Sequence, residues 1–359
     1  MSSPTAASDT PGGIALPGVK CVVWDLDNTI WDGVLLESPD VVLRPGVLDV
    51  LQTLDDRGIL QSVASRNDAD IAMAKLSEFG VADFFLHPQV GWGAKSEAVA
   101  EIVRALNIGA DTVAFVDDEP FERDEVAAGV AGVRSIDSGD YLALPDRRDM
   151  QPQFVTEDSR RRREMYLAED RRKTDEASAQ TTEDFLASLD MVFTLSDAER
   201  GDLARVSELT VRTNQLNSTG VTYSYDELEA LRESSDHRLI IAGLDDRYGT
   251  YGKIGLALVE QRDGVWNLAL LLMSCRVMAR GVGKVLLTYL LKTAAESGAV
   301  VEAEFVRTDR NRLMYLTYKM AGFAELRREG DRIIFRHDPS VVDPYPPHVK
   351  VVEPESRSW

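Results

Sequence analysis

Four acidic residues and one lysine stand where side chains from different segments of the chain can meet. Asp25 and Asp27 end a wholly apolar stretch, "CVVW", and Asp117 with Asp118 follow a second one, "VAFV". Lys95 opens a stretch with helical periodicity, "KSEAVAEIVRALNI". Carboxylates gathered without a cation repel one another, whereas Mg²⁺ prefers oxygen ligands and removes that conflict. The sequence therefore predicts a magnesium site with Asp25, Asp27, Asp117 and Asp118 as candidate ligands.

The same residues, joined by a serine, also suit phosphoryl transfer. Ser65 ends the apolar stretch "LQSVAS" and offers a hydroxyl, and Lys95 offers a fixed cation, to the oxygens of a phosphoryl group. Asp25 is then the candidate nucleophile and Asp27 the candidate general acid and base. The candidate phosphate-binding residues are Ser65, Arg66, Asn67 and Lys95. The alternative is that both acidic pairs are only capped strand ends and turns.

The segments that must bring these residues together alternate in type. From Val19 to Val133, short apolar stretches alternate with amphipathic ones that predict helices over 46–58, 68–80 and 95–108. Such alternation is typical of a parallel sheet with helices on both faces. Because the strands of a parallel sheet end at one edge, ligands bind there. The pattern thus predicts an α/β fold with Asp25, Ser65 and Asp117 at the same edge.

A second stretch with possible chemistry, "LLLMSCRVMARGVGKVLL" at 270–287, runs from a buried strand through a cysteine to a glycine-rich helix start. A helix N-terminus binds anions and lowers the pKa of a nearby thiol. Cys275 is therefore a candidate nucleophile that carries an acyl group as a thioester. The alternative is a buried structural cysteine, which is how we interpret Cys21 in the first strand.

The amide side chains of Asn214, Gln215 and Asn217 are candidates for binding an acyl group or a pantetheine arm. The family resemblance described below adds Arg276, Arg280, Gly281, Gly283 and Asn311 as candidates for the same role. The asparagines have a second interpretation as caps of helices and turns. The arginine run at 160–163 either meets an acidic partner or belongs to a solvated helix.

The length of 359 residues is enough for two domains. We expect a disordered N-terminus over 1–17, an α/β domain over 18–144, a charged linker over 145–184, an α+β domain over 185–338 and a Pro-rich tail without regular structure over 339–359. A helix is expected to begin near Thr156 within the linker. The antiparallel sheet of the second domain is expected to include strands over 239–244, 254–261 and 265–273.

The charge balance limits the partners of the chain. Lys and Arg total 40 and Asp and Glu total 60, which gives a formal net charge of −20. This balance argues against general binding to nucleic acid or to anionic membranes. The two cysteines form no CxxC pair, and no apolar run is long enough to cross a bilayer. We therefore expect a soluble cytoplasmic protein.

The first constellation resembles a known superfamily. DxDxT at 25–29, Ser65, Lys95 and Asp117-Asp118 occur in the order of the four motifs of haloacid dehalogenases (HAD). The resemblance implies Mg²⁺-dependent phosphatase chemistry, with Asp25 as nucleophile and Asp27 as acid and base. Only 37 residues separate Asp27 from Ser65, and 29 separate Ser65 from Lys95, too few for the cap domains that most members insert. We therefore expect a capless HAD-like fold with an open site.

The second constellation, RGVG at 280–283, resembles the phosphate loop of the GNAT acyltransferase fold. Together with "TNQLN", "DRYGTYG", "SCRVMARG" and "TDRNR", the chain resembles FkbH-like proteins of polyketide biosynthesis over nearly all of 19–337. The resemblance implies an α+β GNAT-like second domain. It also implies transfer of the glyceryl group of 1,3-bisphosphoglycerate, with loss of its phosphate, to the phosphopantetheine thiol of an acyl carrier protein. Such units serve as polyketide starters or become methoxymalonyl extender units.

Two other functions remain open from the sequence. One is a small-molecule phosphatase fused to a GNAT N-acetyltransferase, which predicts acetyl-CoA binding and no need for Cys275. The other is a carrier-binding scaffold with inactive sites, against which the complete set of Asp25, Asp27, Ser65 and Lys95 argues.

Overall fold

The computed structural model describes residues 18–213 and 215–354, apart from the side chains of Arg212 and Cys275. The predicted disordered N-terminus and Asn214 lie outside the described residues. The chain divides into two compact units, Met1–Arg163 and Glu164–Trp359. The division falls inside the stretch predicted as a charged linker, so part of that stretch belongs to each unit.

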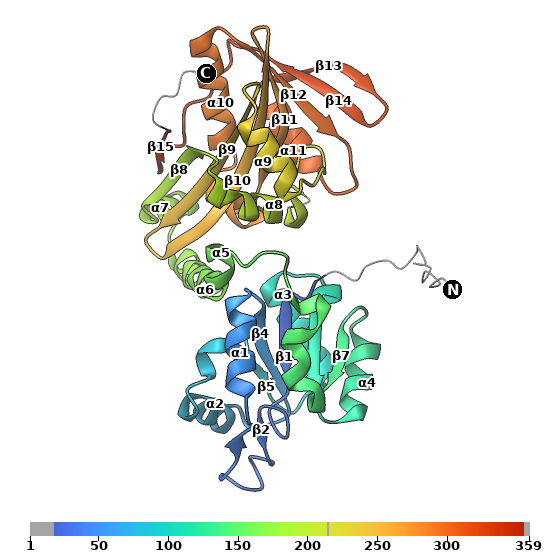
Figure 1. The fold of residues 1–359 in the computed structure, drawn as a ribbon. Helices are drawn as coiled ribbons and strands as arrows, with labels where there is room; N and C mark the ends of the chain where they lie inside the picture. The colour runs from blue at the N-terminus through green and yellow to red at the C-terminus, as the bar shows by residue number, and fades with distance from the viewer. Residues whose placement is uncertain (1–17, 214, 355–359) are drawn as a thin grey trace, which may run out of the picture. The chain divides into compact units, whose positions relative to one another are not determined.

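A five-stranded parallel sheet forms the centre of the first unit (Figure 1). Its order is β5-β4-β1-β6-β7, with β1 at Cys21–Trp24, β4 at Leu60–Ser65, β5 at Gln89–Val90, β6 at Val113–Asp117 and β7 at Arg134–Asp137. All four residues of β1 are buried, and both neighbours pair with it in parallel. The carboxyl ends of β1, β4 and β6 therefore lie at one edge of the sheet, as predicted.

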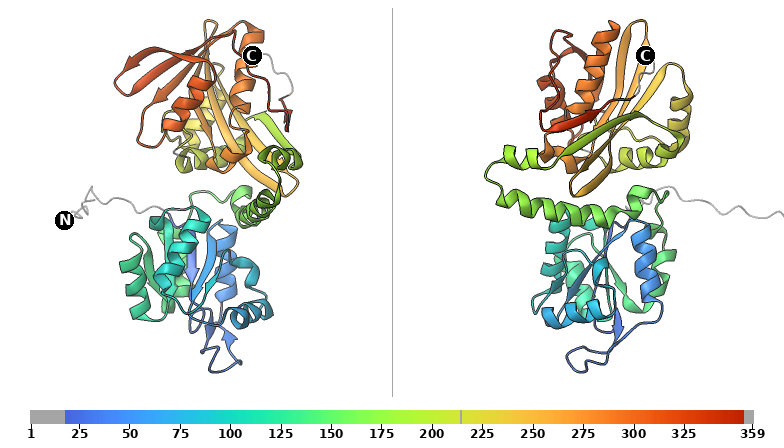
Figure 2. Two further views of the ribbon diagram at one scale, coloured as in Figure 1. Left: turned by 180° about the vertical axis from the view of Figure 1, so that it is seen from behind. Right: turned by 90° about the vertical axis from the view of Figure 1, so that its left-hand side faces the viewer.

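Helices cover both faces of this sheet (Figure 2). They are α1 (Val47–Asp56), α2 (Ala69–Glu78), α3 (Lys95–Leu106) and α4 (Pro120–Gly129), with 3₁₀ segments η1 (Ala82–Phe84), η2 (Ala110–Thr112), η3 (Ser138–Asp146) and η4 (Arg148–Met150). Helix α3 packs against α4, and α1 packs against η3. Between Asp27 and Ser65, where every residue is described, the chain forms the hairpin β2–β3 (Trp31–Asp32, Val42–Leu43) and α1, with no inserted domain. The short helix α5 (Glu157–Arg160) is capped by Thr156, close to the predicted helix start.

An eight-stranded sheet forms the centre of the second unit. Its strands are β8 (Met191–Asp197), β9 (His237–Asp246), β10 (Gly249–Arg262), β11 (Val265–Met273), β12 (Val300–Val306), β13 (Phe323–Glu329), β14 (Arg332–His337) and β15 (Val349–Val352), in the order β13-β14-β12-β11-β10-β9-β8-β15. The three predicted strands fall within β9, β10 and β11, which pair antiparallel. The sheet as a whole is mixed, because β11 pairs in parallel with β12 and β8 with β15.

Alternating side chains of this sheet build two cores. Leu239 and Ile241 of β9 pack with α8 (Leu203–Arg212) and α9 (Tyr225–Glu233), whereas Ile240 and Ala242 pack with α10 (Val285–Ser297). The remaining helical segments are α6 (Arg162–Ser178), α7 (Thr182–Ser188), η5 (Arg200–Asp202), η6 (Cys275–Arg280) and α11 (Arg312–Met320). The predicted fold class, an α/β unit with a parallel sheet followed by an α+β unit, is confirmed. No helix of the described residues is long and apolar enough to span a bilayer.

The C-terminal stretch differs from its prediction. We expected a tail without regular structure over 339–359, but Val349–Val352 forms β15 and pairs in parallel with β8 at the edge of the sheet. Val349 is buried in the core of the second unit. The prediction was wrong for this segment because its prolines lie outside the strand, four before it and Pro354 after it, so the valines remain free to extend an open sheet edge.

Candidate active site

A buried lysine joins two strand ends of the first unit. Lys95 is the first residue of α3, and its Nζ lies 2.8 Å from Asp25 Oδ1 and 2.6 Å from Asp117 Oδ2. Asp25 follows β1 directly, and its backbone N–H continues the sheet by donating to Val116 O. All three side chains are buried. The structure thus brings together the predicted nucleophile, the predicted cation and one predicted metal ligand.

A glutamate that the sequence analysis did not identify completes this cluster. Glu122 contacts Lys95 Nζ with one carboxylate oxygen and lies 3.0 Å from Arg66 Nη1 with the other. It stands in the first turn of α4, the helix that begins just after β6 ends. Arg66 also donates from Nε to Gly93 O at 3.2 Å. Four carboxylates and two cations therefore meet at this edge, because Asp118 follows Asp117.

The acidic side chains fit a divalent cation. Ligand oxygens of Asp25, Asp117 and Asp118, named here the acidic triplet, all lie within 4.8 Å of one another. Hard carboxylate oxygens are the donors that Mg²⁺ prefers. The predicted fourth ligand, Asp27, is not part of the triplet. These three carboxylates would hold the ion, whose charge would offset their repulsion.

The pKa values of the acidic triplet and of Lys95 are raised. Burial raises the pKa of Asp25 to about 7, although Lys95 opposes the shift. Burial also raises the pKa values of Asp117 and Asp118 above their ordinary range. Burial alone would lower the pKa of Lys95, but the charges of Asp25 and Asp117 outweigh it and raise that pKa. Without a further cation, the site favours the protonated form of its carboxylates.

Asp27 occupies a separate, polar environment. Its Oδ1 accepts from Trp31 Nε1 at 2.7 Å and from Leu35 N at 3.0 Å, and its Oδ2 accepts from Asn67 Nδ2 at 3.1 Å. Asn67 is buried, so its side chain positions Asp27 in this structure. A carboxylate fixed in this way, outside the acidic triplet, is available for proton transfer rather than for metal binding.

A cavity of about 410 Å³ opens beside the lysine. Ser65, at the end of β4, lines it together with Lys95, and the segment 89–94 forms a further part of its wall. Glu97 and Glu101 of α3 add acidic groups. The cavity gives a substrate access to the hydroxyl and the ammonium group that were predicted to bind a phosphoryl group.

In the second unit, the predicted asparagines hold two loops together. Asn311 Nδ2 donates to Asn217 O at 3.1 Å and to Val306 O at 2.8 Å. Asn217 Oδ1 accepts from the backbone N–H groups of Thr219 and Gly220. Both asparagines are buried. These contacts match the alternative interpretation of the two residues as loop and turn caps.

The two predicted arginines contact helix α6 and a tyrosine. Arg280 is buried, and its guanidinium lies 2.8 Å from Glu169, 3.1 Å from Glu176 and 3.1 Å from Tyr251 Oη. Arg276 donates to Tyr251 O at 3.2 Å. Nearby, the buried Arg172 of α6 forms an ion pair with Asp246 at 2.7 Å. Arg280 is therefore bound by protein carboxylates where a role in binding an acyl group or a pantetheine arm was predicted.

The remaining predicted residues are Cys275, Asn214, Gln215 and two glycines. The backbone of Cys275 starts η6, directly after Ser274, but its side chain lies outside the described part of the structure, as does Asn214. Gln215 is exposed. Gly281 ends η6 with φ +69°, and a Cβ there would lie 3.1 Å from His348 Nε2, so the position requires glycine. Gly283 has open space around it.

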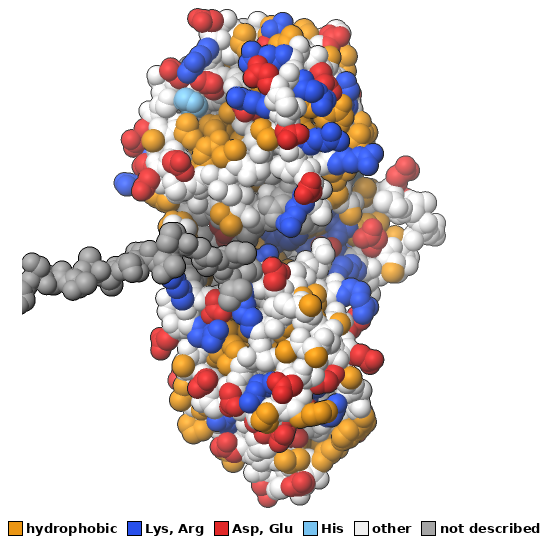
Figure 3. All heavy atoms as spheres, turned by 90° about the vertical axis from the view of Figure 1, so that its right-hand side faces the viewer, with side chains coloured by type: hydrophobic (Ala, Val, Ile, Leu, Met, Phe, Trp, Pro, Cys, Tyr) orange, Lys and Arg blue, Asp and Glu red, His pale blue; other side chains and the backbone are white. Residues whose placement is uncertain are grey.

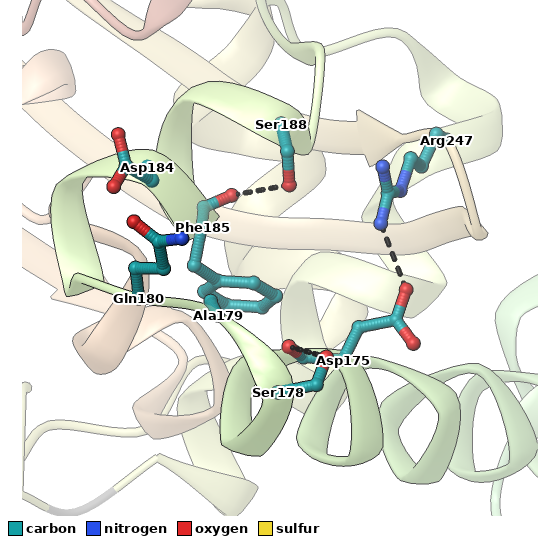
Figure 4. A pocket seen from close by; sticks show the side chains of 8 residues that line it. All are labelled: Asp175, Ser178, Ala179, Gln180, Asp184, Phe185, Ser188 and Arg247. Carbon is teal, nitrogen blue, oxygen red and sulfur yellow. Dashed lines mark hydrogen bonds and ion pairs between the residues drawn. The ribbon is translucent and has the colours of Figure 1, made fainter.

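A second cavity lies elsewhere in the second unit. It measures about 460 Å³ and is lined by residues of α6 and α7 and by Arg247 (Figure 4). Arg247 pairs across it with Asp175 at 2.8 Å. None of the predicted site residues lines this cavity.

Comparisons with known proteins match the chain to one family model and to several solved structures. Residues 33–137 match the family model of haloacid dehalogenase-like hydrolases. The N-terminal part of a Bacteroides fragilis protein, solved with Mg and containing a phosphatase domain, is 32% identical over 35% of this chain, with a TM-score of 0.32. The chain spans 38% of the length of that protein. No curated protein matches the chain.

Solved acetyltransferase structures also resemble part of the chain. The ribosomal-protein-S18-alanine N-acetyltransferase of Escherichia coli is 15% identical, with 40% of this chain and 92% of that chain covered and a TM-score of 0.32. An N-acetyltransferase of Thermoplasma acidophilum, solved with coenzyme A, is 16% identical over 40% of this chain and 98% of that chain, also at a TM-score of 0.32. Acetyltransferases are thus among the structural neighbours of the chain, and residues 33–137 of its first unit match a model of haloacid dehalogenase-like hydrolases.

Proposed function

We propose that the protein transfers the glyceryl group of 1,3-bisphosphoglycerate to the phosphopantetheine thiol of an acyl carrier protein and removes its phosphate ester. The observation that carries the proposal is the buried Asp25 beside Lys95 and the acidic triplet, in a hydrolase-like domain. The sequence resemblance to FkbH-like proteins supplies the substrate and the acceptor. The product would be a glyceryl thioester for polyketide synthesis.

The acyl step needs only a thiolate, because an acyl phosphate is already activated. The thiolate of Cys275 attacks the carbonyl carbon, a C–S bond forms, the C–O bond to phosphate breaks, and inorganic phosphate leaves. The carrier thiol then attacks the new thioester, and Cys275 leaves as the thiolate. The first exchange replaces the acyl phosphate by a thioester, the second exchanges one thioester for another, and neither needs an oxidant or a further co-reactant.

The phosphatase step uses the buried cluster of the first unit. Asp25 attacks the phosphorus of the remaining ester, and Asp27 protonates the leaving glyceryl oxygen. Water then attacks the aspartyl phosphate with Asp27 as base, which releases phosphate and restores Asp25. Lys95 balances the charge on the phosphoryl oxygens. A magnesium ion on the acidic triplet would stabilise negative charge on those oxygens when bound.

Intact mass spectrometry of the carrier protein tests the proposal. The full chain is mixed with Mg²⁺, 1,3-bisphosphoglycerate and a phosphopantetheinylated carrier, which should gain the mass of one glyceryl group. Asp25→Asn should leave the carrier with a phosphoglyceryl group, because only ester hydrolysis is lost. Cys275→Ala should give no loading while phosphate release is partly preserved. A wild-type reaction that adds no mass to the carrier would refute the proposed function.

The alternative, a phosphatase fused to an amine acetyltransferase, is decided in the same samples. It predicts that Cys275→Ala keeps full transferase activity and that the chain binds acetyl-CoA. Acetylation of an amine by the Cys275→Ala variant at the wild-type rate would establish that alternative.

A further inference from the structure

Helix α11 exposes an apolar stripe on the second unit. Leu313, Leu316 and Met320 are 37%, 42% and 68% exposed, whereas Met314 and Tyr318 on the other side of the helix are buried in the core. The spacing i, i+3, i+7 places the three exposed side chains along one line of the helix. A single exposed leucine needs no explanation, but an aligned set on one helix is a candidate contact surface.

Cations border this stripe. Arg312 and Lys319 are exposed on α11 beside it, and Arg310 is exposed in the loop that leads into the helix. No ion pair joins these three to another described residue. Neighbouring arginines differ, since Arg328 pairs with Glu325 and Arg336 pairs with Glu302. We name Arg310, Arg312, Leu313, Leu316, Lys319 and Met320 the α11 surface.

This basic surface is unusual for a chain with a net charge of −20. On the face drawn in Figure 3, Lys and Arg side chains gather over part of the second unit. An acidic protein is repelled by the chain as a whole, so a local group of unpaired cations determines where it can approach.

Hydrogen bonds connect the start of α11 to the turn that carries Cys275. Asn311, directly before the helix, donates to Asn217 O. Asn217 in turn forms a β-bridge with Leu272 at the end of β11. The chain continues from there through Ser274 to Cys275. The start of the α11 surface is therefore connected, through Asn217 and the end of β11, to the turn that carries Cys275, the proposed acyl nucleophile.

We propose that the α11 surface docks an acidic protein that bears an apolar helix face, and that this partner is the acyl carrier protein. The identity of the partner rests on the proposed function, but the surface is assigned from exposure and charge alone. Carboxylates of the partner would pair with Arg310, Arg312 and Lys319, while its apolar side chains would cover Leu316 and Met320. So small a contact is typical of transient complexes, which suits a carrier that must leave after each loading.

Charge reversal on the full chain tests the surface. In Arg312→Glu/Lys319→Glu, the KM for the carrier in glyceryl transfer should rise about tenfold or more, with kcat within about threefold of the wild type. Transfer to free pantetheine, a small thiol without a protein surface, should keep its wild-type rate. Met320→Asp should also raise the KM for the carrier. The matched control is Arg262→Glu, which reverses an exposed charge at the opposite end of β11 from Cys275. It should change neither the KM for the carrier nor the rate of transfer to free pantetheine.

The outcomes separate this inference from the proposed function. An unchanged KM for the carrier in the double variant, or an equal loss with free pantetheine, would overturn the α11 surface. If the wild type loads no acceptor, the proposed function fails by itself, and calorimetric binding of the carrier to wild type and double variant still decides the docking site. Equal affinity of the wild type and the double variant for the carrier in that measurement would also overturn the α11 surface. Binding of phosphatidylserine vesicles that the same substitutions abolish would assign the surface to membranes and overturn the protein partner.

Discussion

Protons and Mg²⁺ should compete for the acidic triplet. Burial raises the pKa of Asp25 to about 7, and it also raises the pKa values of Asp117 and Asp118. Mg²⁺ binds ionised carboxylates, so protonation must be reversed before the ion can bind. We therefore predict that the apparent affinity for Mg²⁺ is constant above about pH 7 and falls below it.

The size of the effect follows from Asp25 alone. Displacing one proton per ion weakens binding about tenfold for each pH unit below the pKa, or about 100-fold between pH 7 and pH 5, which is about 2.7 kcal/mol. Protons taken up by Asp117 or Asp118 would steepen this dependence. Below the pKa of Asp25, the logarithm of the dissociation constant for Mg²⁺ should therefore rise by at least one for each unit by which the pH falls.

The stability of the metal-free protein should have the opposite pH dependence. The pKa of Asp25 rises from 3.8 to about 7 on folding, so between these values the folded chain holds a proton that the unfolded chain has released. Folding stability from this group is therefore present below pH 4 and is lost as pH rises to 7, by about 4 kcal/mol at most. Mg²⁺ offsets the loss, and its stabilising effect should be largest at pH 8.

Calorimetric titration of Mg²⁺ into the full chain at pH 5, 6, 7 and 8 measures this competition. Asp118→Asn removes one member of the triplet and should weaken binding at every pH. Asp124→Asn, an exposed residue on α4, is the matched control and should bind as the wild type does. A dissociation constant that is independent of pH over this range would refute the reasoning, as would wild-type affinity in Asp118→Asn.

Three further substitutions test separate parts of the structure. Asp27→Asn should slow phosphate release by about 100-fold or more because a general acid and base is lost. Its Mg²⁺ affinity, measured by calorimetry, should stay near the wild-type value, and a large loss would make Asp27 a ligand. Arg280→Met removes the buried guanidinium that pairs with the partly exposed Glu169 and Glu176, and should lower the free energy of unfolding in urea by about 2–3 kcal/mol. Lys284→Met, at an exposed pair with Asp343, should cost less than about 1 kcal/mol, and equal losses would contradict the buried network. Val349→Asp should cost about 2 kcal/mol or more because a carboxylate replaces a buried apolar side chain of β15. The same change at the more exposed Val352 is the control, and equal unfolding curves would argue against β15.

The sequence predicted the first site well because strand order determines it. Once β1, β4 and β6 are parallel neighbours, Asp25, Ser65 and Asp117 must end at one edge, and an apolar run is enough to place each strand. Glu122 was missed because its position near Lys95 depends on the direction of α4 relative to β6. No local sequence pattern predicts that direction. A signal was nevertheless present, since an acid in the first turn of a helix that follows such a strand points toward the same edge.

The second unit was less predictable because its decisive contacts join distant segments. Arg280 was predicted to bind an acyl group or a pantetheine arm because of its glycine neighbours, yet its partners Glu169 and Glu176 lie more than 100 residues earlier. Strand β15 likewise depends on an open edge at β8, which is far away in the sequence. Asn217 and Asn311 kept two interpretations until the contact between their loops was known.

The contacts of Arg280 also decide where the second unit can be cut and what can vary within it. A fragment that starts at Phe185, near the predicted domain boundary, would lack Glu169, Arg172 and Glu176, and would leave Arg280 and Asp246 as buried charges without their α6 partners. An exchange of domains between proteins must therefore transfer helix α6 together with the turn around Cys275. The same two segments should also stay together during evolution. An acid lost from α6 would have to be matched by a change at Arg280, so these positions should vary together.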